Sequence, residues 1–315
     1  MSPLFARLCL AGAMVIVGSS VVAGKMMVAE VPLYLASLLR FALAAALLLP
    51  LIRLREGGLP LLAPHTWLVL LGQSLLGSFL FTVLVLYGVQ RTTAGAAGII
   101  TSTTPACVAL IAWPLLGKRP GRREGWGVGL AVLGLLCIHL ATTGSAQTGN
   151  AAPAPLSGNL LVLGAVACES LFLLLRKTVR EPLTALGAST VVTLGGLAWF
   201  LVPGIVEGLR LDWATVPPAG WLLVGYYGAV VTVLAYLLWF VGVVRVDAAQ
   251  AGAFTAVMPV AALLLSRLAL GERLTLWHAV GCVAVLAGIA LVSGVISGLR
   301  RGRPRRNKES DRSSA

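Results

Sequence analysis

Long apolar stretches recur along the whole chain, and they constrain its fold more than any other feature. A bilayer core of roughly 30 Å is crossed by about 20 apolar residues in a helix that rises about 1.5 Å per residue. On that length scale the sequence predicts ten transmembrane helices, near residues 8–28, 32–52, 66–89, 93–116, 125–142, 157–175, 183–205, 218–243, 248–270 and 276–298. We therefore expect an all-α membrane protein.

The composition excludes most other classes of protein. Hydrophobic residues make up 58% of the chain and charged residues 11%, with a mean hydropathy of +0.94, so no stretch is polar enough for a soluble catalytic domain. The net charge of +13 suggests a nucleic-acid partner, but seven of the 24 basic residues lie at 300–312, beyond the last apolar stretch. We expect the lipid bilayer as partner and no nucleic acid.

No motif predicts a metal, a cofactor or a nucleotide. The five cysteines lie in apolar stretches without a CxxC pair, and we interpret them as packing residues. The chain has no Walker loop, no GxSxG turn and no HExxH pair. We therefore predict that it is not an enzyme, that it binds no cofactor, and that it does not drive transport with ATP.

The basic residues of the loops predict the orientation. With both termini inside, 18 lysines and arginines face the cytoplasm and five face outward, and an excess of basic residues normally marks the cytoplasmic side. We expect both termini in the cytoplasm. The first apolar stretch resembles a signal peptide, but the repeat described next requires that it be retained.

The chain contains an internal repeat. Residues 88–138 align with 242–292 at a constant shift of 154, and 14 of the 51 positions are identical. Glycines and prolines dominate the matches, which include Gly88/Gly242, Pro105/Pro259, Gly127/Gly281 and Gly134/Gly288. Five helices separate the copies, so the second copy enters the membrane from the opposite side. We expect a five-helix repeat at 1–142, an uncharged linker at 143–156, a second repeat at 157–298 and a basic disordered cytoplasmic tail at 299–315.

Four motifs resemble those of the drug/metabolite transporters with paired EamA domains. They are the run from Gly18 to Lys25, Pro32 leading to Leu39-Arg40-Phe41, the run from Ala235 to Trp239, and Met258-Pro259 followed by Leu270-Gly271-Glu272-Arg273-Leu274. The resemblance covers residues 8–298. It implies ten helices in two inverted bundles of five, and a carrier of the bacterial inner membrane, commonly an exporter of amino acids or related metabolites. One departure is Lys118, which stands where the second repeat has Glu272.

Two charged residues fall inside predicted helices. Glu169 lies about 12 residues, roughly 18 Å, from the outer face, where an ionised carboxylate costs on the order of 3 kcal/mol or more. It either binds substrate or a proton, or forms a structural hydrogen bond to another helix. Arg40 lies roughly 12 Å deep and either extends to the surface or turns inward to bind a substrate carboxylate or Glu169. Lys25, nearer the outer edge, is expected to extend to the surface.

Two prolines interrupt the fourth and ninth predicted helices. Pro105 and Pro259 each leave the carbonyl four residues earlier, that of Thr101 or Thr255, without its amide donor. Either neighbouring hydroxyls bind these carbonyls, or the two kinks flank the substrate pathway at one central cavity.

The remaining candidates are hydroxyls and aromatic rings. Ser19 and Ser20 either bind substrate or form a close helix contact beside Gly18. Tyr236 and Trp239 share one helix face and form either packing contacts or an aromatic wall of the pathway. Tyr87, Tyr226 and Tyr227 are further candidates for this wall.

Inverted repeats favour a carrier, because two similar halves can exchange conformations and open a central site to either face in turn. The leading hypothesis is a secondary transporter that exports a small polar or zwitterionic metabolite such as an amino acid or its derivative, with the proton as the candidate coupling ion. An importer or exchanger on the same fold is an alternative. A second alternative is an intramembrane enzyme for a lipid-linked substrate, in which Glu169 acts as acid or base and Arg40 binds the phosphate. A third alternative is a sensor or channel. The sequence leaves the oligomeric state open.

Overall fold

The computed structural model describes residues 3–60, 62–117, 119, 121–144, 154–176, 178–179, 181, 183–246 and 248–292. Every regular element in these ranges is a helix. The first half contains α1 (Pro3–Glu30), α2 (Leu33–Glu56), α3 (Pro64–Gln73), η1 (Ser74–Leu80), α4 (Phe81–Arg91), α5 (Ala94–Thr101), α6 (Thr104–Leu116) and α7 (Arg122–Gly144). The second half contains α8 (Pro155–Arg176), α9 (Ala185–Arg210), η3 (Trp213–Thr215), α10 (Pro218–Gly225), η4 (Tyr226–Leu234), α11 (Ala235–Val243), α12 (Ala248–Phe254), α13 (Val257–Leu270) and α14 (Leu276–Val292). Most of the predicted linker and the whole predicted tail lie outside the described residues.

Seven helical segments in the described ranges are long and apolar enough to cross a membrane. They are α1, α2, the continuous α3–η1–α4, α7, α8, α9 and the continuous α10–η4–α11. The pair α5 and α6 is an eighth candidate, bent by 44°, and α13 and α14 are shorter apolar helices. The protein is therefore an all-helical, multi-pass membrane protein. The ten-span inverted arrangement is compatible with these helices and stays a prediction.

The fourth and ninth predicted helices are broken rather than continuous, which corrects the predicted proline kinks. Ser102 and Thr103 separate α5 from α6, and Thr255 and Ala256 separate α12 from α13. Pro105 and Pro259 lie in the first turn of the helix that follows each break, where a missing amide breaks no helical hydrogen bond. The prolines therefore begin helices instead of bending them.

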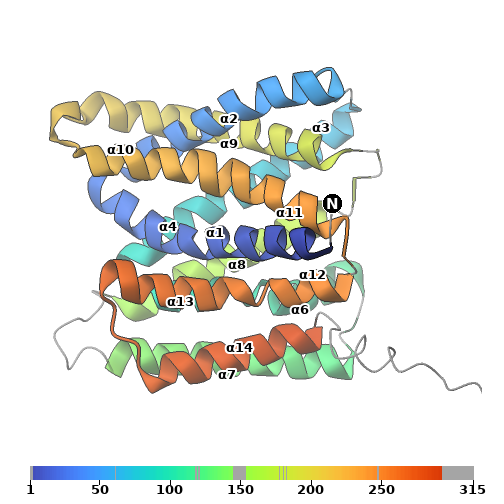
Figure 1. Cartoon of the computed structure of the whole chain (residues 1–315), viewed down its shortest axis with the longest axis vertical. Helices are drawn as coiled ribbons and strands as arrows, with labels where there is room; N and C mark the ends of the chain where they lie inside the picture. The colour runs from blue at the N-terminus through green and yellow to red at the C-terminus, as the bar shows by residue number, and fades with distance from the viewer. Residues whose placement is uncertain are drawn as a thin grey trace, which may run out of the picture.

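The helices lie roughly along one direction and pack mostly between the two halves of the chain (Figure 1). The pair α2 and α9 forms the upper edge in this view and the pair α7 and α14 the lower edge, with α1, α4, α8 and α13 between them. The start of α1 and the end of α14 lie at the same end of the bundle. The largest interfaces are α7 with α14, α2 with α9, α4 with α8, α1 with α13 and α1 with α11.

Glycines mark equivalent contacts in the two halves. A Cβ at Gly88 of α4 would lie 3.1 Å from the Gly158 carbonyl oxygen of α8, and one at Gly242 of α11 would lie 2.9 Å from the Ala6 carbonyl oxygen of α1. Gly88 and Gly242 are the residues that the repeat aligns. The first helix of each half thus packs on the third segment of the other half, as expected for two halves with equivalent positions.

The interface between α7 and α14 is reciprocal. A Cβ at Gly127 would lie 2.9 Å from the Gly288 carbonyl oxygen, and one at Gly281 would lie 3.1 Å from the Gly134 carbonyl oxygen. The repeat aligns Gly127 with Gly281 and Gly134 with Gly288, so exchanging the halves maps one contact onto the other. This is the self-complementary pattern of a two-fold interface, here within one chain.

We predict that Gly127→Ala lowers the melting temperature of the purified protein. The added methyl group would lie 2.9 Å from a backbone oxygen and 2.6 Å from Val292 Cγ2, and overpacking of this kind costs about 1–3 kcal/mol. Gly129→Ala is the matched control on the same helix, because a Cβ there meets nothing within 4 Å. Equal melting temperatures for the two variants would contradict the close contact.

Candidate functional site

Glu169 lies on α8 beside the break between α5 and α6. Its Oε2 accepts a hydrogen bond from Thr104 Oγ1 at 2.7 Å, and the side chain is half-buried. Because α8 begins at Pro155, Glu169 is about 21 Å along the helix and about 10 Å from its end, which agrees with its predicted position in the span to within about one residue. The hydrogen bond to another helix is present, and a role in binding substrate or a proton stays a prediction.

Hydroxyl groups satisfy the backbone at this break. Thr104 Oγ1 lies 2.7 Å from the Thr101 carbonyl oxygen, Ser102 Oγ donates to Gly98, and Thr103 Oγ1 donates to Ile100. Thr101 is buried, and its own hydroxyl lies 3.0 Å from the carbonyl oxygens of Ala97 and Gly98. At the second break, the Met258 amide donates to the Thr255 carbonyl oxygen at 3.2 Å. The Thr255 carbonyl is thus paired, and the Thr101 carbonyl shares the single proton of the Thr104 hydroxyl with Glu169. Of the two interpretations, this geometry favours the packing one.

Arg40 turns inward rather than to the surface. Its side chain is 7% exposed, and Nη2 donates to Thr82 Oγ1 of α4 at 2.5 Å. The guanidinium carbon lies 4.4 Å from the ring centre of Phe41 and 4.6 Å from that of Tyr227 in η4. Its recorded partners do not include Glu169, which binds Thr104 instead, so the predicted pairing of the two charges is wrong for this conformation.

The guanidinium of Arg40 has an N–H group that remains available for a further hydrogen bond. Arg40 Nε–H has no hydrogen-bond acceptor recorded in the structure, nor does the hydroxyl of Ser37, which lies one helical turn earlier and is fully buried. A guanidinium presents its N–H groups in a planar fork that matches a carboxylate. Arg40 and Ser37 therefore offer two buried polar groups at one place on α2. We call Ser37, Arg40, Phe41, Thr82 and Tyr227 the Arg40 cluster.

A π-helical segment supplies the tyrosine of this cluster. In η4 the Thr232 hydroxyl donates to the Tyr227 carbonyl oxygen five residues earlier, at 2.9 Å. The other π-helix, η1, covers Ser74–Leu80, which the shift of 154 places on 228–234. π-Helical segments are rare and occur often at functional sites. The sequence analysis missed both segments, which lie outside the aligned repeat of 88–138 with 242–292.

Ser19 and Ser20 form contacts within and between helices. Ser19 Oγ lies 2.6 Å from Tyr226 Oη of η4, and also donates to the Ile16 carbonyl oxygen. Ser20 Oγ donates to the Val17 carbonyl oxygen. Gly18 is buried against α13, where a Cβ would lie 2.6 Å from the Met258 carbonyl oxygen. These contacts favour the close-packing interpretation of Gly18, Ser19 and Ser20. Ser19 also contacts Tyr226, the residue that precedes Tyr227 of the Arg40 cluster.

The predicted aromatic wall is not formed as one surface. Tyr87 of α4 packs edge-on against Tyr34, with ring centres 6.4 Å apart, and Arg91 lies over its face. Tyr236 of α11 donates its hydroxyl to the Ala185 carbonyl oxygen at the start of α9, and Trp239 is half-buried one turn later. Tyr34 and Ala185 lie at opposite ends of the antiparallel pair α2 and α9, so Tyr87 and Tyr236 pack at separate places, and an aromatic lining of the pathway stays a prediction.

A hollow of about 490 Å³ is recorded near the end of α2, lined by Leu49, Pro50, Ile52, Arg53, Gly58 and Leu59. It does not include Thr101, Pro105, Thr255 or Pro259. Thr101 and Pro259 lie on α5 and α13, which pack against each other, whereas Pro105 lies on α6, whose Trp113 is exposed. Their predicted approach to one central cavity stays a prediction.

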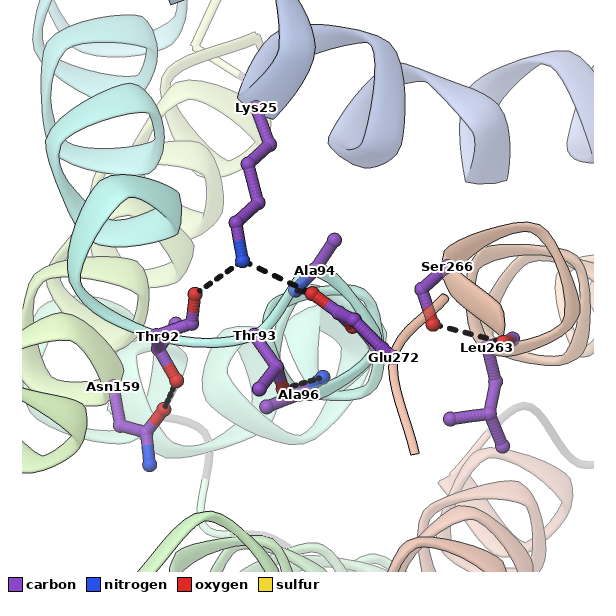
Figure 2. A network of polar contacts seen from close by, with 10 residues as sticks. Lys25, Thr92, Thr93, Ala94, Ala96, Asn159, Leu263, Ser266 and Glu272 are labelled. Carbon is purple, nitrogen blue, oxygen red and sulfur yellow. Dashed lines mark hydrogen bonds and ion pairs between the residues drawn. The ribbon is translucent and has the colours of Figure 1, made fainter. Parts of the chain in front are cut away.

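Lys25 forms an ion pair, which corrects the prediction that it extends to the surface. Figure 2 shows its Nζ between the Thr92 carbonyl oxygen and Glu272 Oε1, each at 3.0 Å. Glu272 also accepts hydrogen bonds from the amides of Ala94 and Gly95 at the start of α5, at 2.7 and 2.9 Å. One end of the bundle is therefore held by a charged network that joins three segments.

Comparison with known proteins decides the family. The EamA-like transporter family matches the chain twice, over residues 4–140 and 156–294. The chain belongs to this family. It is similar to the "Uncharacterized transporter YetK" of Bacillus subtilis, with 42% identity over 284 residues that cover 90% of this chain and 85% of the relative. The EamA protein described here is thus a membrane transporter.

Two further likenesses are more distant. A protein of Streptantibioticus cattleyicolor named "Probable terminal-alkyne amino-acid exporter" is 26% identical over 227 residues, covering 71% of this chain and 72% of that protein. A solved crystal structure covers 94% of this chain and 99% of its own, with a TM-score of 0.62 and 21% identity. The latter likeness concerns the fold alone.

Proposed function

We propose that this EamA transporter exports a small metabolite that carries a carboxylate, of the amino-acid type, across the bacterial inner membrane. The observation that carries the proposal is Arg40, a buried cation inside a membrane-spanning helix. Cations in such segments are rare because of their desolvation, and they usually pair with another group or mark a substrate pathway. Here the two aromatic faces and Thr82 hold the guanidinium, while Nε–H has no acceptor among the described residues.

The chemistry of the Arg40 cluster favours a carboxylate as the bound group. A guanidinium binds a carboxylate through charge-assisted hydrogen bonds, which are about twice as strong as neutral ones. The Ser37 hydroxyl, one turn away, adds a second donor. The rings of Phe41 and Tyr227 suit an apolar side chain of the substrate. A small amino acid or its derivative combines these features.

The direction of transport rests on relatives. The resemblance to drug/metabolite transporters implies an exporter, and the Streptantibioticus relative is named as one. Import or exchange on the same fold would use the same contacts. The alternative of an intramembrane enzyme requires Glu169 and Arg40 to act together, whereas their partners here are Thr104 and Thr82.

We predict that overexpression raises the level of one or a few carboxylate-bearing metabolites in the culture medium, measured by untargeted mass spectrometry against a deletion strain. Arg40→Lys should lower this excess by about tenfold, because an ammonium group lacks the planar fork of the guanidinium. Arg245→Lys is the matched control, since Arg245 is exposed and its guanidinium binds the Val241 carbonyl oxygen of its own turn.

A medium unchanged by overexpression, or an equal loss in both lysine variants, would contradict the proposal. Vesicles of defined orientation test the direction with the metabolite that the comparison identifies. Accumulation only in inside-out vesicles supports export, and accumulation only in right-side-out vesicles identifies an importer.

We further propose that Glu169 couples transport to protons, because a carrier without a nucleotide site needs an ion or substrate gradient. Glu169→Gln should fold and insert normally but should remove the response of transport to an imposed pH gradient in liposomes. Thr104→Ser is the matched control, because it keeps the hydroxyl that binds Glu169. If wild-type flux ignores the gradient, or if the Gln variant responds as wild type does, Glu169 has a structural role.

Both termini are proposed to face the cytoplasm, as the count of basic residues predicts. The described ends Pro3 and Val292 lie at one end of the bundle, which an even number of spans requires. A cytoplasmic reporter fused after Ala315 should be active and a periplasmic phosphatase at the same place inactive. The opposite pattern would overturn the orientation.

A further inference from the structure

The network around Glu272 joins parts of both halves of the chain at one end of the bundle. Lys25 comes from the end of α1, Thr92, Ala94 and Gly95 from the junction of α4 and α5, and Glu272 from the loop between α13 and α14. Figure 2 shows these three segments converging on the carboxylate. Any opening of this end that moves α1 or α5 away from the loop must break these bonds.

The hydrogen bonds to Glu272 are of a strong type and are partly shielded from water. Glu272 accepts from two backbone amides at a helix N-terminus and from an ammonium group, so each bond is charge-assisted. The side chains of Lys25 and Glu272 are 28% and 12% exposed, which limits screening by water and salt. Neighbouring contacts reinforce the closure, because Thr92 Oγ1 lies 2.6 Å from Asn159 Oδ1 of α8.

The described residues at the other end are joined by weaker contacts. Thr184 Oγ1 donates to Glu56 Oε2 at 2.9 Å, and the Ala63 amide donates to Glu181 at 3.2 Å, in both cases at exposed positions. Exposed hydrogen bonds exchange readily with water and contribute little. In the sequence, the shift of 154 aligns Glu272 with Lys118, so the acidic residue occurs in one repeat only.

We infer that Lys25, Glu272 and the start of α5 form a latch that holds this end of the transporter closed and biases the protein toward the conformation opened at the other end. The inference goes beyond the proposed substrate and direction, and it holds for any substrate. The latch bonds exist only in the conformation in which this end is closed. Their loss therefore shifts the ligand-free equilibrium toward conformations in which this end is open.

The test measures distances between spin labels attached at Ala29→Cys and Arg273→Cys, two exposed positions on opposite sides of the latch, after replacement of the native cysteines. It needs no substrate. Lys25→Gln and Glu272→Gln keep the side-chain size but remove the charge pair, and each should raise the ratio of long to short distances by about tenfold or more. Lys25→Arg keeps the positive charge, so this variant should show the same ratio of long to short distances as the wild type. Thr184→Ala, at the other end, should leave it unchanged.

A wild-type distance distribution in both glutamine variants, or an equal shift in Thr184→Ala, would overturn the proposed latch.

Hydrogen exchange on the unmodified chain provides a second measurement that does not depend on the variants folding. The amides of Ala94 and Gly95 should exchange slowly, because both donate to Glu272. Exchange at the rate of unprotected amides would show that this end is open most of the time and would overturn the inference as well.

Discussion

Backbone hydrogen bonding in hydrocarbon is the constraint on which this structure depends. A membrane interior offers no water, so each amide and carbonyl needs a partner within the protein. Helices meet this need over most of the chain. Where α5 ends before α6, the hydroxyls of Ser102, Thr103 and Thr104 bind the carbonyls that the break exposes. The same break brings Thr104 to Glu169, so a local solution for the backbone also fixes the environment of the one carboxylate on α8.

Close packing between the halves is the second organising feature. Glycines at α4, α7, α11 and α14 allow backbones to approach where any side chain would collide. The central helices α5 and α13 pack in the same way, since a Cβ at Gly98 would meet the side chain of Ala262. Each half therefore depends on the other for its largest interfaces, although the sequence describes them as two repeats.

Much of this could be predicted from residues alone, because hydropathy and glycine spacing act over whole helices. The all-helical membrane fold and the glycine contacts between the halves are of this kind. Lys25, the aromatic residues and the prolines were harder, since their roles depend on which neighbour tertiary packing supplies. The sequence places Lys25 near the end of a helix but does not show that the loop carrying Glu272 packs beside it. The π-helices left no local pattern in the sequence, and they pack against α2 and α9 of the tertiary structure.

The interface of α7 with α14 has a consequence for biosynthesis. Gly127 and Gly134 lie in the first half of the chain, yet their partners Gly288 and Gly281 belong to the last described helix. During synthesis, α7 enters the bilayer long before α14 exists, and its glycine face meets lipid or another helix in the meantime. The interface between α7 and α14 thus forms only after α14 has been synthesised.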